Sequence, residues 1–282
     1  MRWAAAALAA GFVFLPGAGA AGSRVPSFAH VLVIVFENKA PAAVLGHAAA
    51  APTFKSLAIR NAMLTRYSSI THPSLPNYLA LVSGSTHRIR SDCTDCLVSG
   101  PSLADTLEKA QRSWKTYAEG LPRPGWTGCC TGRYAKKHVP FLYFRNVVTR
   151  PARVRRVVPL GRLWRDLASR RLPDFSLVVP DLCHDMHDCS VHMGDAWLGR
   201  ALPRLLRNPQ LSRAVVFVVF DEPPVGEGTL VPALAIGPLV RRGSVDATPT
   251  SHYGLLRTIE DAWGLPRLGR SAAAAPIAGI WR

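Results

Sequence analysis

Residues 175–197 read FSLVVPDLCHDMHDCSVHMGDAW, and this stretch decides the fold expected for the chain. It begins with a short apolar, β-branched run, Phe175 to Pro180, of the kind that forms an interior strand of a parallel sheet. Six acidic or imidazole side chains follow within a dozen residues: Asp181, His184, Asp185, His187, Asp188 and His192. In open α/β sheets ligands bind at the carboxyl ends of the strands, so the pattern predicts a functional site at that edge.

The same arrangement occurs twice more. The apolar run 30–36 leads into Glu37 and Asn38, and the run 214–220 leads into Asp221 and Glu222. A single acidic residue after a strand is commonly a helix cap. Three sets gathered at one edge would repel one another unless a cation neutralised them, and oxygen-rich sets suit a hard or borderline divalent metal. We therefore expect a metal site between three strand ends.

Length and composition fit one large α/β domain, although two small domains would also be compatible. The chain has 282 residues, of which 48% are hydrophobic. Its start combines Arg2, an apolar stretch and small residues up to Ala20, which predicts a secretory signal peptide cleaved near Ala20. The expected organisation is a signal peptide over residues 1–20 and a single domain over 21–282, secreted to the extracellular space or cell envelope.

Export would make disulfides the expected role of the six cysteines, because an oxidising compartment favours them over metal thiolates. The cysteines form three pairs in the sequence: Cys93 and Cys96, Cys129 and Cys130, and Cys183 and Cys189. We expect the last pair to be bridged, and the first two pairs to be bridged to each other. A zinc site in those first two pairs is the alternative, but their spacing lacks a second separated pair.

The formal net charge of +16 favours polyanions, phosphorylated substrates and anionic membrane surfaces as partners. Arginines are densest between Arg150 and Arg171, where a solvated basic face is the alternative reading. Neither a nucleic-acid fold motif nor aromatic interleaving accompanies this run. No specific nucleic-acid target is therefore expected, and nothing in the sequence predicts a protein partner.

A second chemical segment is THPSLPNYLALVSG, residues 71–84. Ser74 precedes Pro76 and an amphipathic stretch, which places it in the first turn of a helix, where backbone N–H groups favour an anion. An ordinary N-cap serine is the alternative, with Asn77 and Tyr78 on the helix surface. Beside a metal the hydroxyl would be acidified and become a usable nucleophile, with Thr71 in reserve.

Several segments taken together resemble the secreted bacterial phosphoesterase family. They are FENKAP (36–41), THPSLPNYLALVSG (71–84), GRYAKKHVPF (132–141), DMHDCSVHMGDAWL (185–198), VVFDE (218–222) and SHYGLLRTIED (251–261). This family groups acid phosphatases with phospholipase C enzymes in the alkaline-phosphatase-like superfamily. Within it the chain resembles the mycobacterial type of secreted acid phosphatase that acts on phosphoinositides. The resemblance implies an α/β three-layer sandwich with a central, mostly parallel sheet.

The resemblance also implies residue roles. The implied metal ligands are Glu37, Asn38, Ser74, Asp221 and Glu222. The implied catalytic residues are Ser74 as nucleophile, with His187 and His252 as acid–base groups. The implied substrate-binding residues are Asn77, Asp185 and Asp188, and His72 joins them as a phosphate or hydrogen-bond partner because it lies next to the expected nucleophile. Because Asp221-Glu222 replaces the Asp-His pair of the two-zinc members, one divalent ion of open identity is expected.

The expected function is hydrolysis of phosphate monoesters, on small molecules or on lipid headgroups such as those of phosphoinositides, through a phosphoserine intermediate. One alternative is a phosphodiesterase of the phospholipase C type, which would need room for a second ester substituent. Another is a non-catalytic secreted polyanion binder. The segment Lys136-Lys137-His138 either contacts a substrate phosphate or forms a solvated basic turn.

Overall fold

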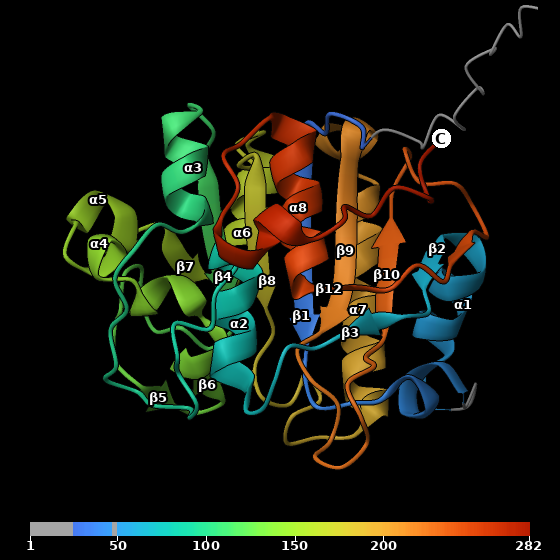
Figure 1. The fold of residues 1–282 in the computed structure, drawn as a ribbon, viewed down its shortest axis with the longest axis horizontal. Helices are drawn as coiled ribbons and strands as arrows, with labels where there is room; N and C mark the ends of the chain where they lie inside the picture. Colours follow the sequence, from blue (N-terminus) through green and yellow to red (C-terminus); the bar gives the residue numbers. More distant parts are fainter. Residues whose placement is uncertain (1–24, 47–49) are drawn as a thin grey trace, which may run out of the picture.

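The computed structural model describes residues 25–46 and 50–282, and the expected signal peptide lies outside them. The main sheet contains eight strands: β1 (His30–Phe36), β2 (Ala62–Leu64), β4 (Trp114–Ala118), β7 (Val157–Pro159), β8 (Phe175–Val179), β9 (Ala214–Phe220), β10 (Ala233–Ile236) and β11 (Val245–Asp246). Their order is β11-β2-β10-β9-β1-β8-β4-β7 (Figure 1). In this sheet only β10 runs against the others, which confirms the mostly parallel sheet expected from the sequence.

The three apolar runs that precede the acidic residues are β1, β8 and β9, and they lie side by side at the centre of the sheet. Val31 pairs with Phe175 on one side, and Phe36 pairs with Phe220 on the other. All of β8 and β9 is buried, as expected for strands covered on both faces. This register brings the residues after all three strands to one edge.

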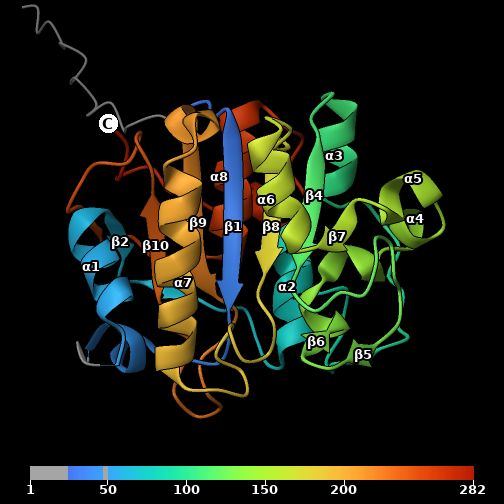
Figure 2. The same cartoon turned by 180° about the vertical axis from the view of Figure 1, so that it is seen from behind.

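Helices cover both faces of the sheet, so the fold has three layers. In Figure 1 α2, α3 and α8 lie in front of the strands, and Figure 2 shows α1, α6 and α7 on the opposite face. The α-helices are α1 (Pro52–Arg60), α2 (Ser74–Ser83), α3 (Leu103–Lys109), α4 (Arg145–Val148), α5 (Pro151–Val154), α6 (Gly161–Ala168), α7 (Val191–Leu206) and α8 (His252–Trp263). None of the described helices combines the length and apolar character that crossing a membrane requires.

Short elements complete the chain. Two small sheets pair β3 (Tyr67–Ser68) with β12 (Thr250–Ser251) and β5 (Cys130–Thr131) with β6 (Tyr134–Ala135). The remaining helical turns are η1 (Ala42–Gly46), η2 (Lys136–His138), η3 (Pro140–Tyr143), η4 (Pro209–Arg213) and η5 (Gly269–Ala273).

Helix α2 is buried along its entire length and is fixed at its carboxyl end by a close backbone contact. Gly84 ends the helix in a left-handed conformation, with φ of 69°, and a Cβ there would collide with the carbonyl of Leu268. A Cβ at Gly269 would in turn collide with the backbone of Gly84. The Arg270 N–H donates to the Gly84 carbonyl at 2.8 Å. Only glycine allows these two backbones to approach so closely.

The disulfides differ in part from the expected pairing. Cys183 and Cys189 are bridged as expected. The expected cross-pairing of the other four cysteines is wrong, because each pair is bridged locally, Cys93 to Cys96 and Cys129 to Cys130. Sequence spacing alone cannot choose among the fifteen connectivities of six cysteines.

Candidate active site

The site forms where β1, β8 and β9 end, next to the first turn of α2. Glu37 follows β1, and its backbone N–H donates to the Asp185 carbonyl at 2.8 Å. The Asp221 N–H, just after β9, donates to the Phe36 carbonyl at 2.9 Å. Asn38 then turns the chain with a φ of 51°, which asparagine tolerates better than most residues, and its N–H donates to Asp221 Oδ1 at 3.2 Å.

Glu37 is fully buried and accepts two hydroxyl hydrogen bonds from α2. Ser74 Oγ donates to Glu37 Oε2 at 3.0 Å, and the Tyr78 hydroxyl donates to Oε1 at 2.5 Å. Ser74 and Tyr78 are one helical turn apart, so they present neighbouring hydroxyls from one face of the helix. The proposed nucleophile therefore contacts a buried carboxylate directly.

Three carboxyl groups share this buried space, and their pKa values shift accordingly. Burial, and then the charges of Asp221 and Asp185, hold the pKa of Glu37 well above its usual range. Burial raises the pKa of Asp221 to about 6, although hydrogen bonds to this carboxylate, among them those of Glu37 and Ser74, act to lower it. Burial also raises the pKa of Asp185, although the hydrogen bond from the backbone N–H of His187 acts to lower it. Such crowding is stable only with protons or a cation among the carboxylates.

Several buried atoms of the site have no hydrogen-bond partner among the described residues, and three of them face the carboxyl cluster. These three are Asp221 Oδ2, Asp185 Oδ2 and His138 Nε2. Unpaired buried lone pairs are unfavourable unless a ligand satisfies them. Oxygen atoms with an imidazole nitrogen are an ordinary donor set for a divalent metal, so the residues present fit such an ion.

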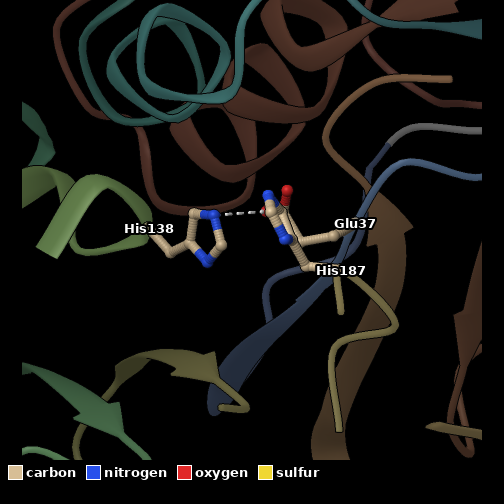
Figure 3. A group of neighbouring side chains, drawn as sticks. All are labelled: Glu37, His138 and His187. Atoms are coloured by element: carbon tan, nitrogen blue, oxygen red, sulfur yellow. Dashed lines mark ion pairs between the residues drawn. The ribbon is translucent and has the colours of Figure 1, made fainter. Parts of the chain in front are cut away.

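His138 lies between Glu37 and Asp185, and His187 lies beside it. His138 Nε2 is 3.4 Å from Glu37 Oε1, and its Nδ1 is 3.2 Å from Asp185 Oδ2. The ring stacks on Tyr78 with the ring centroids 5.2 Å apart. Ligand atoms of Glu37, His138 and His187 all lie within 4.8 Å of one another, and Figure 3 shows the three side chains converging. Burial, and then the charges of Lys137 and His187, lower the pKa of His138 well below its usual value.

His187 is partly exposed and has a polar partner at each ring nitrogen. Its Nδ1 is 2.6 Å from Asp188 Oδ1, and its Nε2 is 3.1 Å from Lys137 Nζ. Lys137 also donates to Asp92 Oδ2 at 2.8 Å. The imidazole is thus oriented by a carboxylate on one side and faces a cation on the other.

His252 is buried, and both its ring nitrogens have partners. Its Nε2 lies 2.8 Å from the Asp221 carbonyl, and its Nδ1 lies 2.9 Å from the Tyr67 hydroxyl. Burial lowers its pKa to about 4. These contacts hold the backbone of Asp221 in place from the first turn of α8.

Glu222 faces a different pair of residues from Asp221. Glu222 Oε2 accepts from Asn77 Nδ2 at 3.1 Å, and His72 Nδ1 lies 3.1 Å from the same oxygen. Burial, and then the charge of Asp221, raise the pKa of Glu222 to about 8. Asn77 additionally accepts from the N–H groups of residues 70 and 71, so it shapes the loop before α2.

Sequence reasoning missed several contributors to the site. The alternative in which Ser74 is an ordinary N-cap places Tyr78 on the helix surface, yet Tyr78 is 1% exposed and contacts Glu37. The solvated basic turn also does not form, because Lys136 and His138 are buried. Asp92 binds Lys137 and accepts a hydrogen bond from the Leu75 N–H, and no sequence pattern indicated that it belongs to the site. The motif GRYAKKHVPF carried the one available hint, since it belonged to the family resemblance.

A second set of potential ligands lies beside the site. Glu119, Asp181 and His184 place ligand atoms within 4.8 Å of one another. Glu119 Oε2 joins the three residues, because it lies 3.0 Å from His184 Nδ1 and accepts from the Asp181 N–H at 3.1 Å. The set therefore ties the ends of β4 and β8 together.

Comparison with known proteins identifies sequence relatives along most of the chain. The family model described as "Phosphoesterase family" matches residues 47–266. The phosphatidylinositol-3-phosphatase of Mycobacterium tuberculosis is 38% identical over 281 residues, which cover 99% of this chain and 91% of that protein. The acid phosphatase of Aspergillus fumigatus is 30% identical over 246 residues, 83% of this chain and 55% of that protein. The chain thus spans about half the length of that fungal relative.

Solved structures share the fold at low sequence identity. A protein of the alkaline phosphatase superfamily from Vibrio parahaemolyticus aligns with a TM-score of 0.59 at 13% identity, covering 89% of this chain and 72% of its own. The phosphonate monoester hydrolase of Agrobacterium radiobacter aligns with a TM-score of 0.58 at 14% identity, covering 90% and 78%. These likenesses confirm the alkaline-phosphatase-like α/β fold that the sequence led us to expect.

Proposed function

The chain belongs to the phosphoesterase family and is a phosphoric ester hydrolase, and from this premise we propose that it is a secreted, metal-dependent phosphatase of phosphate monoesters. The hydrogen bond of Ser74 to buried Glu37 carries the proposal, because it places a hydroxyl in the crowded carboxyl cluster. Phosphoinositides are included among the proposed substrates, since one relative is a phosphatidylinositol-3-phosphatase.

The proposed metal ligands are Glu37, Asn38, Ser74, Asp221 and Glu222. Support for Glu37 and Asp221 comes from their burial, their raised pKa values and the unpartnered Asp221 Oδ2. A divalent ion bound there would neutralise the carboxylates and act as a Lewis acid toward the phosphoryl group and the Ser74 hydroxyl. His138, whose Nε2 is 3.4 Å from Glu37 Oε1, is the next candidate for this ligand set.

We propose that Ser74 is the nucleophile. Its oxygen attacks phosphorus, the bond to the ester oxygen breaks, and a phosphoserine forms at the start of α2. Glu37 is the nearest acceptor for the hydroxyl proton, at 3.0 Å. Water then attacks the phosphoserine and releases inorganic phosphate, which restores the hydroxyl. Thr71 is less well placed, because its hydroxyl donates to the neighbouring His72 carbonyl instead of to a carboxylate.

For acid–base work the contacts favour His187 over His252. His187 is partly exposed, and Asp188 orients it as a carboxylate orients the histidine of a catalytic triad. It would protonate the leaving oxygen and then activate the water. His252 is enclosed by Tyr67 and Asp221, so we propose a positioning role for it.

The substrate phosphate would lie between Ser74 and His187. Lys137 and half-exposed His72 are the basic groups on the two sides of this position. Two of the residues expected to bind substrate act indirectly instead. Asn77 holds the loop before α2, and Asp188 orients His187. Asp185 receives the His187 N–H at 2.8 Å and supports the same loop.

Secretion is proposed from the sequence of residues 1–20 together with the three disulfides. Structural disulfides persist mainly in oxidising compartments. Detection of the mature protein outside the cell, beginning near residue 21, would support this part of the proposal, and retention of an uncleaved reduced protein would refute it.

One assay tests the proposed reaction. The purified protein should hydrolyse p-nitrophenyl phosphate and show little activity on bis-p-nitrophenyl phosphate. Preference for the diester would indicate a phospholipase C-type enzyme instead, and no turnover with any added divalent metal would indicate a non-catalytic binder. Rapid acid quenching followed by mass spectrometry should locate the trapped phosphoryl group on Ser74.

A further inference from the structure

A basic cavity lies outside the catalytic site, between the outer strand β7 and the start of α6. Its volume is about 380 Å³. Four of its lining side chains are cationic, and none is acidic: Lys115, Arg155, Arg162 and Arg165. This concentration of charge belongs to the arginine-rich run that the catalytic proposal leaves unused.

Part of this charge is neutralised inside the protein. Asp166, buried behind the cavity, forms ion pairs with Lys115 and Arg162 and accepts from the Tyr117 hydroxyl at 2.8 Å. Elsewhere in the run, Arg153 binds Asp105 and Glu108 in the same manner. Lys115, Arg162 and Arg153 are therefore paired with carboxylates of the protein itself and are not free for a ligand.

Arg155 and Arg165 are different. Both line the cavity, both are exposed, and neither side chain has a hydrogen bond or ion pair within residues 25–46 and 50–282. A guanidinium group matches the geometry of phosphate oxygens and is more weakly hydrated than an ammonium group. Two such unpaired groups at one cavity are suited to an oxyanion.

The cavity also has room for a ligand next to them. Gly161, the first residue of α6, lines it, and a Cβ built there would have no heavy atom within 4 Å. Val158 and Pro159 bring the end of β7 to the cavity, and β7 is parallel to β4, which is parallel to β8. The end of β7 that lines the cavity therefore faces the same edge of the sheet as the strand ends of the catalytic site, and Figure 2 shows β7, β4 and β8 side by side.

We propose that this cavity is a second anion-binding site, which binds a phosphate group carried by an anionic lipid headgroup or present as free inorganic phosphate. Because the cavity and the catalytic site lie toward one edge, a surface that presents many phosphate groups can occupy both together. The site would hold the enzyme near such a surface without taking part in the chemistry.

The test compares three variants of the full mature protein. R155A/R165A removes the two unpaired arginines, and Gly161→Leu fills the cavity without changing the charge. R150A/R171A is the matched control, since Arg150 and Arg171 are exposed members of the same run, do not line the cavity and lose the same charge. All three variants should hydrolyse p-nitrophenyl phosphate at the wild-type rate.

Two binding measurements distinguish the ligand sources. The first is co-sedimentation with phosphatidylcholine vesicles that contain phosphatidylserine, a lipid without a phosphate monoester. If the source is a lipid headgroup, R155A/R165A and Gly161→Leu should bind about tenfold more weakly or worse, and the control should stay within about twofold. The second is calorimetric titration with inorganic phosphate. If the source is free phosphate, wild type should show one more binding event than these two variants.

The proposal is overturned if both cavity variants match R150A/R171A in both measurements. It is also overturned if R155A/R165A loses binding while Gly161→Leu does not, because that result would indicate diffuse surface charge and not a cavity. Absence of p-nitrophenyl phosphate turnover by wild type would count against the proposed function alone, since neither binding measurement depends on catalysis.

Discussion

Ser74 is the residue on which the proposed chemistry depends most directly. Replacing it with alanine removes the hydroxyl while leaving a helix start that Pro73 and Pro76 already favour. We expect turnover of p-nitrophenyl phosphate to fall by about 10⁴-fold or more. The lost hydrogen bond to Glu37 should lower the free energy of unfolding by only about 1 kcal/mol, measured by denaturant titration.

Thr71→Ala is the control for this prediction, because the Thr71 hydroxyl donates to the adjacent His72 carbonyl and not to a carboxylate of the site. It should keep most of the wild-type turnover. Loss of activity in Thr71→Ala, with retention in Ser74→Ala, would transfer the nucleophilic role to Thr71.

Variants of the two candidate histidines should affect different properties, His187 the activity and His252 the stability. His187→Ala removes the partly exposed, proposed acid–base group, so kcat should fall by about 10²- to 10⁴-fold with little change in melting temperature. His252→Phe leaves the Tyr67 hydroxyl and the Asp221 carbonyl without a buried partner, and the free energy of unfolding should fall by about 1 to 3 kcal/mol or more. A stable His252→Phe protein without activity, beside an active His187→Ala protein, would reverse the assignment.

At the scale of elements, the loop after β8 carries Asp185 and His187 and is closed by the Cys183–Cys189 bridge. Replacing both cysteines with serine should lower turnover about tenfold or more, because rates fall steeply when reacting groups are misplaced. The free energy of unfolding should fall by only about 2 to 3 kcal/mol, since the loop is short. Unchanged kcat, or free thiols at both positions in the unreduced wild type by mass spectrometry, would contradict this prediction.

Sequence patterns predicted the central elements well and the connections poorly. The apolar runs of β1, β8 and β9 are local signals, and burial on both faces follows from them. The roles of Tyr78 and His138 depend on η2 packing against α2, a contact between segments about 60 residues apart that no local pattern encodes. The cysteine pairing failed in the opposite direction, because bridges between distant segments were expected and Cys93–Cys96 and Cys129–Cys130 are bridged locally.

At the scale of the whole molecule, three distant segments bring their carboxyl groups into one buried cluster, and its electrostatics should govern stability. Asp221 has a folded pKa of about 6 against an ordinary value of 3.8, so the folded state binds more protons than the unfolded state between these values. Stability from this group is full at low pH and is lost as pH rises through about 6. The raised pKa values of Glu37, Asp185 and Glu222 act in the same direction and outweigh the opposite effect of the lowered pKa values of the buried histidines His138 and His252. Metal-stripped protein should therefore melt at lower temperature at pH 7 than at pH 5.

Added divalent metal should reverse this trend, because it binds the ionised carboxylates and only in the folded state. The gain in melting temperature on adding metal should be larger at pH 7 than at pH 5, by differential scanning fluorimetry. Glu260, buried with a pKa raised by burial to about 7, adds a pH dependence of the same sign, but it lies away from the site and should not respond to metal. Equal metal-induced shifts at both pH values would contradict the cluster as the binding site.

The contact between Gly84 and Gly269 at the carboxyl end of α2 fixes the orientation of the whole helix. Ten residues of helix are about 15 Å long, so a rotation of about 4° at Gly84 and Gly269 would displace Ser74 by about 1 Å. A displacement of that size is enough to reduce an enzymatic rate about a hundredfold. The position of the proposed nucleophile thus depends on the opposite end of the helix, where a single added methyl group should lower the catalytic rate without touching the substrate.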